Sequence, residues 1–200
     1  GVAKTRLLHT LRDHGAQIID LEGLANHKGS VLGLEPHACQ PSQKHFETLL
    51  WQAVNELNPN QPIFAEAESN RIGSLHCPPA LWQKLGRSTV IEIQMPLTQR
   101  AHFLLDDYPY FTVKPQHLKG LLEKLIKLRG NKKIAQWHEQ IDNANWMAFV
   151  ESILNDHYDL VYRSAGDEQS NYPPPSDIIE LEGFSTPVLK AAAKKLISRV

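Results

Sequence analysis

The sequence is poor in cysteine, and its two cysteines, Cys39 and Cys77, are not spaced as a CxxC pair. This scarcity predicts neither a disulfide framework nor a cysteine-based metal site, so we expect a reducing, cytoplasmic setting. The ten histidines show no HxxxH or HExxH spacing, and we assign none of them to a metal. No apolar run approaches the roughly 18 residues that a membrane-spanning helix needs, which predicts that the chain has no membrane partner.

Excess charge of either sign is also absent, since 21 basic and 22 acidic residues leave a formal net charge of −1. A nucleic-acid partner would therefore need a local basic patch. Residues 114–133 form such a patch, with seven basic residues and only Glu123 as an acid. The patch predicts contacts to a phosphate backbone, and a solvated helix face is an equal alternative. The predicted nucleic-acid contacts are Lys119, Lys124, Lys127, Arg129, Lys132 and Lys133.

What the chain does contain is an alternation of apolar strands and amphipathic helices. We expect strands near residues 17–21, 62–66, 89–93 and 177–181, and helices over 4–14, 42–57, 79–85, 96–107 and 185–198. This order predicts an α/β fold of the P-loop NTPase type, with three α/β/α layers and a mostly parallel sheet. Residues 116–157 carry helical periodicity only. We therefore predict an α/β domain of residues 1–113 and 164–200 with a helical subdomain, 114–163, inserted in it.

The start of the chain carries the strongest local motif, Gly1-Val2-Ala3-Lys4-Thr5, directly before a predicted helix. It resembles the second half of GxxxxGK[ST], in which backbone N–H groups and Lys hold phosphates and the hydroxyl binds a metal ion. Ala3 stands where the second Gly is expected, which is acceptable if its φ stays negative. A plain N-terminal helix is an equal alternative. Because a buried strand feeds such a loop, we expect the sequence to be a piece of a longer protein.

Residues 22–41 contain three glycines and two prolines, which predicts a loop of 20 residues. Loops of that length inside a compact domain are usually functional. Its acids, bases and hydroxyl suit a polar ligand, although a loop with polar residues is also simply a loop. The predicted substrate-loop residues are Asp20, Glu22, His27, Lys28 and Ser30.

Glu66 and Glu68 lie at the carboxyl end of the predicted strand 62–66, at the edge where open parallel sheets bind ligands. Either carboxylate is a candidate to hold a metal ion or to act as a general base. Arg71 and Arg100 are candidate anion ligands. A solvated strand end and two surface arginines are the plainer alternatives, and we assign no residue to a resident metal site.

Three blocks of sequence together resemble a known family. The first is residues 19–30, which include the run DLEGLANHKGS. The second is residues 40–47, QPSQ with Phe46-Glu47. The third is residues 66–73, with EAES and Ile72-Gly73. In order and spacing they are similar to the C-terminal P-loop domain of bacterial tRNA 2-selenouridine synthase, over roughly residues 1–163.

The resemblance implies an activity that composition cannot give. It implies a transferase that replaces the sulfur of 2-thiouridine at the tRNA wobble position with selenium from selenophosphate. It further implies a geranylated intermediate made with geranyl diphosphate. In that family a rhodanese-like domain carries the cysteine of the selenium step, and neither Cys39 nor Cys77 falls in a matching motif. Mg²⁺ is a possible cofactor, tRNA the expected partner, and the rhodanese-like domain a second partner within the full-length protein.

Two other function classes fit parts of the pattern. The half P-loop and the arginine-bearing helix suit a small-molecule or nucleotide kinase, against which Ala3 and the DLEGLANHKGS run argue. The basic patch also suits a tRNA-binding module without catalysis of its own, because fold alone never decides function.

Overall fold

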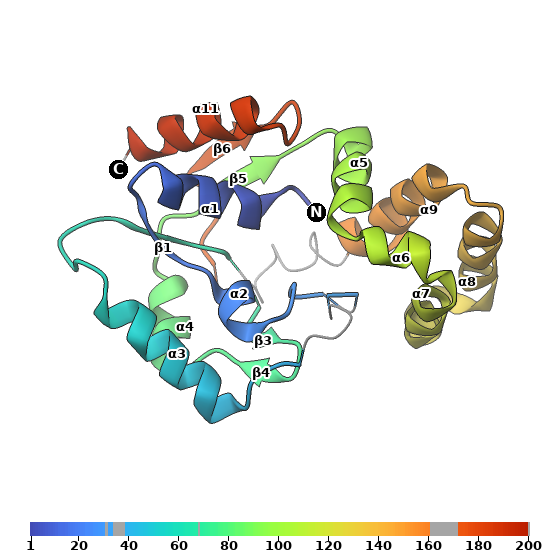
Figure 1. Ribbon diagram of the computed structural model, residues 1–200, viewed down its shortest axis with the longest axis horizontal. Helices are drawn as coiled ribbons and strands as arrows, with labels where there is room; N and C mark the ends of the chain where they lie inside the picture. The colour runs from blue at the N-terminus through green and yellow to red at the C-terminus, as the bar shows by residue number, and fades with distance from the viewer. Residues whose placement is uncertain (31, 34–38, 68, 161–171, 200) are drawn as a thin grey trace. The chain divides into compact units, whose positions relative to one another are not determined.

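The structure is a computed structural model that describes residues 1–30, 32–33, 39–67, 69–160 and 172–199. The chain divides into two compact units, and Figure 1 shows the elements of each. The α/β unit comprises Ala3–Gln94 and Asn171–Val200. The helical unit comprises Gly1–Val2 and Met95–Ser170.

Short strands in the α/β unit form three pairs. They are β1 (Gln17–Ile19) with β2 (Ile63–Ala65), β3 (Arg71–Ile72) with β4 (Leu75–His76), and β5 (Ile91–Gln94) with β6 (Asp177–Glu180). The first and third pairs are parallel, and the β3–β4 hairpin is antiparallel. In the first pair Ile18 lies opposite Phe64, and in the third Ile93 lies opposite Ile179. The predicted α/β fold with mostly parallel strands is therefore confirmed.

The described part of this unit contains five helices, of which all but α2 were predicted. They are α1 (Lys4–Asp13), α2 (Leu21–Ala25), α3 (Gln43–Asn55), α4 (Pro79–Leu85) and α11 (Thr186–Ile197). Helix α1 buries Leu7, Leu8 and Leu11 along one stripe and packs on α11 and β1. Ser42 caps α3 as predicted, because its hydroxyl accepts the N–H of His45. Figure 1 draws α1 beside α11.

One hydrophobic core of the unit joins the strands to α3. Phe46 and Leu50 of α3 pack with Ile19 of β1 and Leu21 of α2, and Phe46 has no exposed surface. Ile72 and Leu75 of the hairpin close the same core. Burial of these apolar side chains makes the main favourable contribution to the free energy that holds α2 and the hairpin against the strands.

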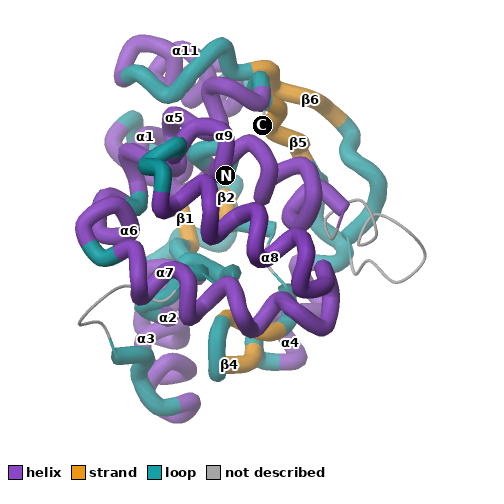
Figure 2. The backbone as a smooth tube through the Cα atoms, turned by 90° about the vertical axis from the view of Figure 1, so that its right-hand side faces the viewer, coloured by secondary structure: helices purple, strands orange, loops and turns teal. Residues whose placement is uncertain are grey.

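In the helical unit the described elements are helices. They are α5 (Leu97–Asp107), α6 (Pro109–Val113), α7 (Pro115–Leu122), η1 (Glu123–Leu125), α8 (Ile126–Asp142), α9 (Trp146–Ile153) and η2 (Leu154–Tyr158). Figure 2 shows α7 and α8 side by side, and α5 packs on α9. Trp137 of α8 is fully buried and donates its ring N–H to Ser152 of α9 at 3.0 Å. Gly130, with φ 80°, kinks α8 near its start.

Several expectations differ from the structure. The predicted loop over 22–41 is partly wrong, because Asp20 caps the short helix α2 and helical structure runs to Ala25. The β3–β4 hairpin was not predicted, since two-residue strands carry no periodicity. The helical unit begins at Met95 and so includes α5 and α6, which the prediction placed in the α/β part. No helix in the described ranges is long and apolar enough to cross a bilayer.

Candidate functional site

The site begins at the N-terminus of α1. Lys4 and Thr5 occupy its first turn, where backbone N–H groups lack helical acceptors and the helix dipole favours an anion. Ala3, the residue before the helix, has φ 56° and ψ 29°. The condition for an unstrained alanine at this position, a negative φ, is therefore not met. A left-handed alanine costs roughly 1–3 kcal/mol, and strain of this kind gathers at ligand-binding sites.

Three carboxylic acids come together beside this helix start. Asp20 and Glu22 lie at the junction of β1 and α2, and Glu66 follows β2. Thr5 Oγ1 donates to Glu22 Oε2 at 2.8 Å, which connects the acids to α1. The N–H of Leu21 donates to Glu66 Oε2 at 3.0 Å. The arrangement follows from topology, since the carboxyl ends of paired parallel strands meet at one edge.

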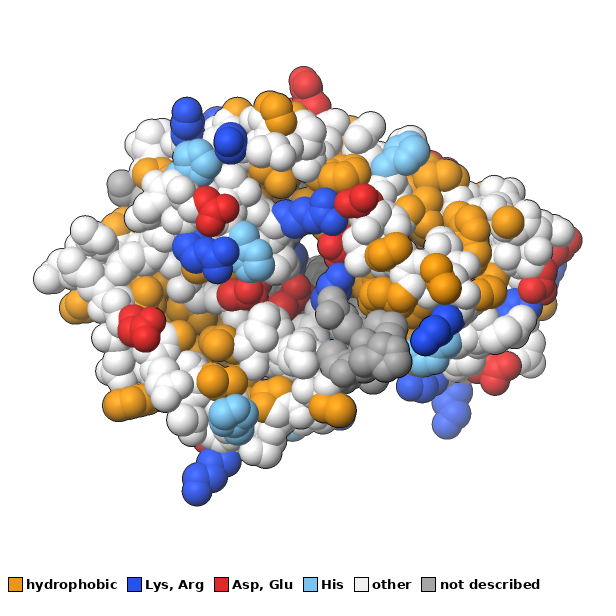
Figure 3. All heavy atoms as spheres, viewed as in Figure 1, with side chains coloured by type: hydrophobic (Ala, Val, Ile, Leu, Met, Phe, Trp, Pro, Cys, Tyr) orange, Lys and Arg blue, Asp and Glu red, His pale blue; other side chains and the backbone are white. Residues whose placement is uncertain are grey.

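Asp20 is held from two sides. Its Oδ1 accepts the N–H of Gly23 at 2.7 Å, which caps α2. Its Oδ2 lies 2.6 Å from His9 Nε2 of α1. On the face drawn in Figure 3, acidic side chains gather beside a histidine over α1 and α2. His9 is a site residue that sequence reasoning missed, because a lone histidine on a helix carries no motif.

Glu66 is the buried member of the cluster, with 3% of its surface exposed. Burial, and then the charges of Asp20 and Glu22, raise the pKa of Glu66 to about 8, against the lowering effect of the Leu21 N–H. Its second oxygen, Oε1, is buried and has no hydrogen-bond partner in the described residues. A buried oxygen without a partner is costly, so this position is prepared for a proton, a cation or an N–H donor.

Lys4 and Glu66 line one groove of about 790 Å³ in the α/β unit. Leu7, Leu8 and Leu11 of α1 contribute apolar surface to it. Residues 62–67, around β2, and Val90 and Ile91, at β5, also line it. Lys4, which we predicted to bind phosphate, and Glu66, which we predicted to be catalytic, therefore lie on one continuous surface.

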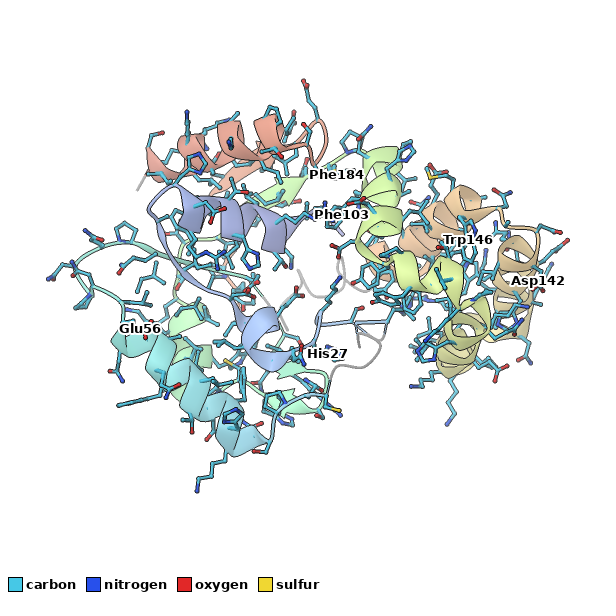
Figure 4. All side chains as sticks on the ribbon, viewed as in Figure 1. His27, Glu56, Phe103, Asp142, Trp146 and Phe184 are labelled. Carbon is cyan, nitrogen blue, oxygen red and sulfur yellow. The ribbon has the colours of Figure 1, made fainter. Side chains whose placement is uncertain are left out.

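The substrate-loop residues divide into two groups. Asp20 and Glu22 belong to the acidic cluster described above. His27 lies just beyond α2 (Figure 4), and its Nδ1 accepts the N–H of Gly29 at 3.1 Å. Lys28 and Ser30 shape a tight turn, because the N–H of Lys28 donates to Gly33 and that of Ser30 donates to Lys28. Hydrogen bonds within the turn thus account for part of the polar composition of residues 27–33.

The remaining predicted residues have different surroundings. Glu68 lies outside the described residues. Arg71 of β3 is exposed and its Nε donates to the carbonyl of Gly73 at 2.9 Å. Arg100 of α5 makes a bidentate pair with Asp159, at 2.9 and 2.6 Å, so an anion there would compete with a carboxylate. Gly1 and Val2 belong to the helical unit with Arg100, and their predicted roles stay predictions.

Half of the predicted nucleic-acid contacts already have partners within the helical unit. Lys119 pairs with Asp142 (labelled in Figure 4), Lys133 pairs with Asp156, and Arg129 donates to His157. Burial and the charge of Arg129 lower the pKa of His157. The other three lysines are exposed, and among the described residues no acid pairs with them. They are Lys124, Lys127 and Lys132.

The sequence places this site in a family. The family model described as "tRNA 2-selenouridine synthase AAA domain" matches residues 1–124, more than half of the chain. The chain belongs to this family. The predicted resemblance is confirmed, and the matched region contains α1, the three carboxylic acids and most of the residues that line the groove. No solved structure matches the chain.

Curated relatives carry the name of the family as well. A tRNA 2-selenouridine synthase of Alcanivorax borkumensis is 39% identical over 190 residues, covering 81% of this chain and 51% of the relative. One of Shewanella frigidimarina is 37% identical over 192 residues, covering 81% of this chain and 50% of the relative. One of Nitrosomonas europaea is 35% identical over 113 residues, covering 54% and 28%. The chain thus spans about half or less of the length of these relatives.

Proposed function

We propose that this chain is the phosphate-handling part of a transferase that modifies tRNA. The reaction replaces sulfur by selenium in 2-thiouridine at the wobble position, through a geranylated base. Family membership supports the reaction class, and both selenophosphate and geranyl diphosphate present phosphate groups to an enzyme. The observation that carries the proposal is the junction of α1 with the acidic cluster, where Thr5 reaches Glu22 at 2.8 Å.

In this proposal the phosphate binds at the N-terminus of α1. Its first N–H groups lack helical acceptors, and Lys4 adds a full positive charge in the same turn. As the geranyl carbon leaves its diphosphate, negative charge grows on the leaving oxygen. Fixed donors stabilise that charge without reorganising, which lowers the barrier to transfer. Neutralising the leaving group is the part of the reaction that this chain's own residues perform.

The acidic cluster fits Mg²⁺ as a cofactor of that step. No group of three or more His, Cys, Asp or Glu in the described residues forms a ready metal cage. Mg²⁺ does not need one, since it is usually held by one or two carboxylates, substrate phosphates and water. Thr5 Oγ1, Glu22 and the partnerless Oε1 of Glu66 are the oxygens that would hold it. When bound, the ion supplies positive charge to the phosphate oxygens.

The exposed lysines of the helical unit provide the contact with tRNA. Lys124, Lys127 and Lys132 are exposed, and they bring positive charge to α8 and the 3₁₀ turn before it. Binding through such residues reads the phosphate backbone and not the bases. The selenium step itself requires the rhodanese-like domain of the full-length protein, with the cysteine that the family implies there.

Substitution of Lys4 in the full-length enzyme tests the phosphate site. Lys4→Ala is expected to lower geranyl transfer to a 2-thiouridine anticodon stem-loop by about 10²-fold and to weaken diphosphate binding in calorimetry. Arg12→Ala is the matched control, because Arg12 is an exposed cation at the far end of α1. Its transfer rate should stay within about twofold of the parent, as surface substitutions usually do.

Two outcomes would contradict the proposal. Unchanged transfer and unchanged diphosphate binding in Lys4→Ala would remove the phosphate site from α1. Phosphoryl transfer from ATP by the isolated chain, independent of tRNA, would favour a kinase instead. Assaying the isolated chain beside the full-length protein separates these cases and shows which step each part performs.

A further inference from the structure

A stack of aromatic rings in the helical unit ends at the surface. Phe111 of α6 is buried, and its ring stacks on that of Tyr108, with the planes 5° apart and the ring centroids 5.7 Å apart. The ring of His117, in α7, stacks on Phe111 with a centroid distance of 6.4 Å and an angle of 26°. His117 is exposed. An exposed ring that rests on a buried one presents a flat surface of fixed orientation to the solvent.

The packing of α7 holds His117 in this place. Pro115 begins the helix, where its missing N–H removes no helical hydrogen bond. Leu118, directly after His117, is 1% exposed, and Leu122 is fully buried. These anchors determine which face of α7 reaches the solvent. The His117 ring therefore loses less conformational freedom on binding a ligand than a side chain on a loose segment would.

Positive charge continues along the same helical face. After His117, the exposed residues Gly120, Lys124 and Lys127 follow at i+3, i+7 and i+10, spacings that place them on one side of a helix. The backbone keeps right-handed helical angles where α7 passes into η1 and where η1 passes into α8. An added Cβ at Gly120 would meet no side chain within 4 Å beyond its adjoining residues, so the surface after His117 is open. Figure 3 shows basic side chains gathered beside a histidine over α7.

A flat ring beside lysines suits RNA that is not paired. In an A-form duplex the faces of the bases are covered by their neighbours, so a protein ring stacks on a base only where that base is unpaired. Histidine is one of the rings that proteins use for this contact, and the stacking adds to the attraction between lysines and phosphates. A protein partner fits less well, because lysine is depleted in protein interfaces and residues 114–133 carry seven basic residues against one acid.

We propose that an unpaired base of the tRNA stacks on His117 while phosphates of the same strand contact Lys124 and Lys127. The face from His117 to Lys127 is about 15 Å long at the rise of an α-helix, so one short single strand reaches all three residues. Lysines alone hold any phosphate backbone, paired or unpaired. The ring makes the difference, and His117 is thus the residue by which the helical unit distinguishes a loop of the tRNA from a stem. The inference rests on the proposed function for the identity of the RNA, and it adds a base contact to the backbone contacts proposed there.

The affinities of the full-length protein for two RNAs test the proposal. One RNA is an anticodon stem-loop, and the other is a blunt duplex with the same number of phosphates, each labelled for fluorescence anisotropy. The parent protein is expected to bind the stem-loop about tenfold more tightly than the duplex. His117→Ala should lose about tenfold in affinity for the stem-loop and stay within about twofold for the duplex. His117→Phe keeps a flat ring without its nitrogens, and it should retain the preference of the parent.

Three further variants separate stacking from other effects. His117→Leu fills similar space without an aromatic ring, so it should behave like His117→Ala. Lys124→Ala removes a phosphate contact only, so it should weaken binding of the stem-loop and of the duplex by the same factor. His102→Ala changes another exposed histidine of the helical unit, in α5, and should leave both affinities unchanged. Circular dichroism of each variant checks that the fold is kept.

Two results overturn the proposal. One is equal affinity of the parent protein for the stem-loop and the duplex. The other is a His117→Phe variant that binds the stem-loop no better than His117→Ala, because the nitrogens of the imidazole and not its flat ring would then make the contact. Both RNAs are bound without diphosphate and without transfer, so either result leaves the phosphate site at Lys4 untouched. Absence of any tRNA binding by the full-length protein would instead count against the proposed function itself.

Discussion

The backbone N–H of Leu21 donates to Glu66 Oε2 at 3.0 Å, so a buried carboxyl group after β2 holds the first residue of α2. The contact joins residues 45 positions apart. It connects the core, where Leu21 is 1% exposed, to the acidic cluster beside α1. The protonation state of Glu66 therefore bears on both the stability of the fold and the chemistry of the site.

Glu66→Gln is expected to change the pH dependence of stability. Because the pKa of Glu66 is raised from 4.5 to about 8, the folded state binds more protons than the unfolded state between these values. Stability from this group is thus fully present below pH 4.5 and is lost as the pH rises towards 8. Glutamine keeps the acceptor for Leu21 but does not ionise, so its melting temperature should fall less over this window. Parallel curves for the two proteins would contradict the raised pKa.

The left-handed backbone of Ala3 determines whether two substitutions at this position raise or lower the free energy of unfolding. Ala3→Gly relieves roughly 1–2 kcal/mol of backbone strain but removes a buried methyl worth about 0.8 kcal/mol, so the free energy of unfolding should rise by roughly 0.2–1.2 kcal/mol. Ala3→Val places a β-branched side chain at φ 56° and should cost more than about 2 kcal/mol. Urea denaturation measures both.

Ala191→Val is the control for that pair. Ala191 is exposed on α11, so the same two added methyl groups should cost only the difference in helix propensity between alanine and valine, about 0.5 kcal/mol. If Ala3→Val were no worse than Ala191→Val, the left-handed conformation of Ala3 would not hold in solution.

Two glutamine side chains take the place of a neighbouring strand at the β3–β4 hairpin. Gln43 accepts the N–H of His76 and donates to its carbonyl, both at 2.9 Å. Gln40 accepts the N–H of Ser74 at 2.8 Å and donates to the carbonyl of Ile72 at 2.9 Å. Gln40→Ala should destabilise the α/β unit by about 1–3 kcal/mol, because it removes the partner of the part-buried Ile72 carbonyl. Thermal denaturation of Gln52→Ala, an exposed glutamine of α3, should show almost no change.

The exposed lysines predict a salt-dependent tRNA affinity. The triple change of Lys124, Lys127 and Lys132 to Ala should weaken tRNA binding most at low salt. If each lysine holds one phosphate, the slope of log affinity against log salt should fall by about 2–3 units. The matched control changes three exposed lysines of α11, namely Lys190, Lys194 and Lys195. Filter binding at several salt concentrations measures both, and equal effects would mean that the basic patch is only a solvated surface.

Much of this fold is predictable because its signals are local. The apolar stripe of Phe46 and Leu50 with the Ser42 cap predicts α3, and Pro79 marks the start of α4. The meeting of Asp20 and Glu66 follows from one topological rule, that parallel strands end at the same edge.

Other features depend on contacts between distant residues, which carry no local signal. The hairpin is held by Gln40 and Gln43, more than 30 residues before their partners. Lys119 is neutralised by Asp142, 23 residues away, so a count of charges along the chain overstates the basic patch. His9 joins the site only because α1 packs on β1.

The bidentate pair of Arg100 and Asp159 has a consequence for the history of the helical unit. It joins α5 to the residue directly after η2, 59 positions later, so it fastens the beginning of the described helices to their end. A segment whose two ends are held together can be inserted into a host loop without pulling its flanks apart. Such a segment can be inserted, replaced or deleted as one unit without changing the strands of the α/β unit.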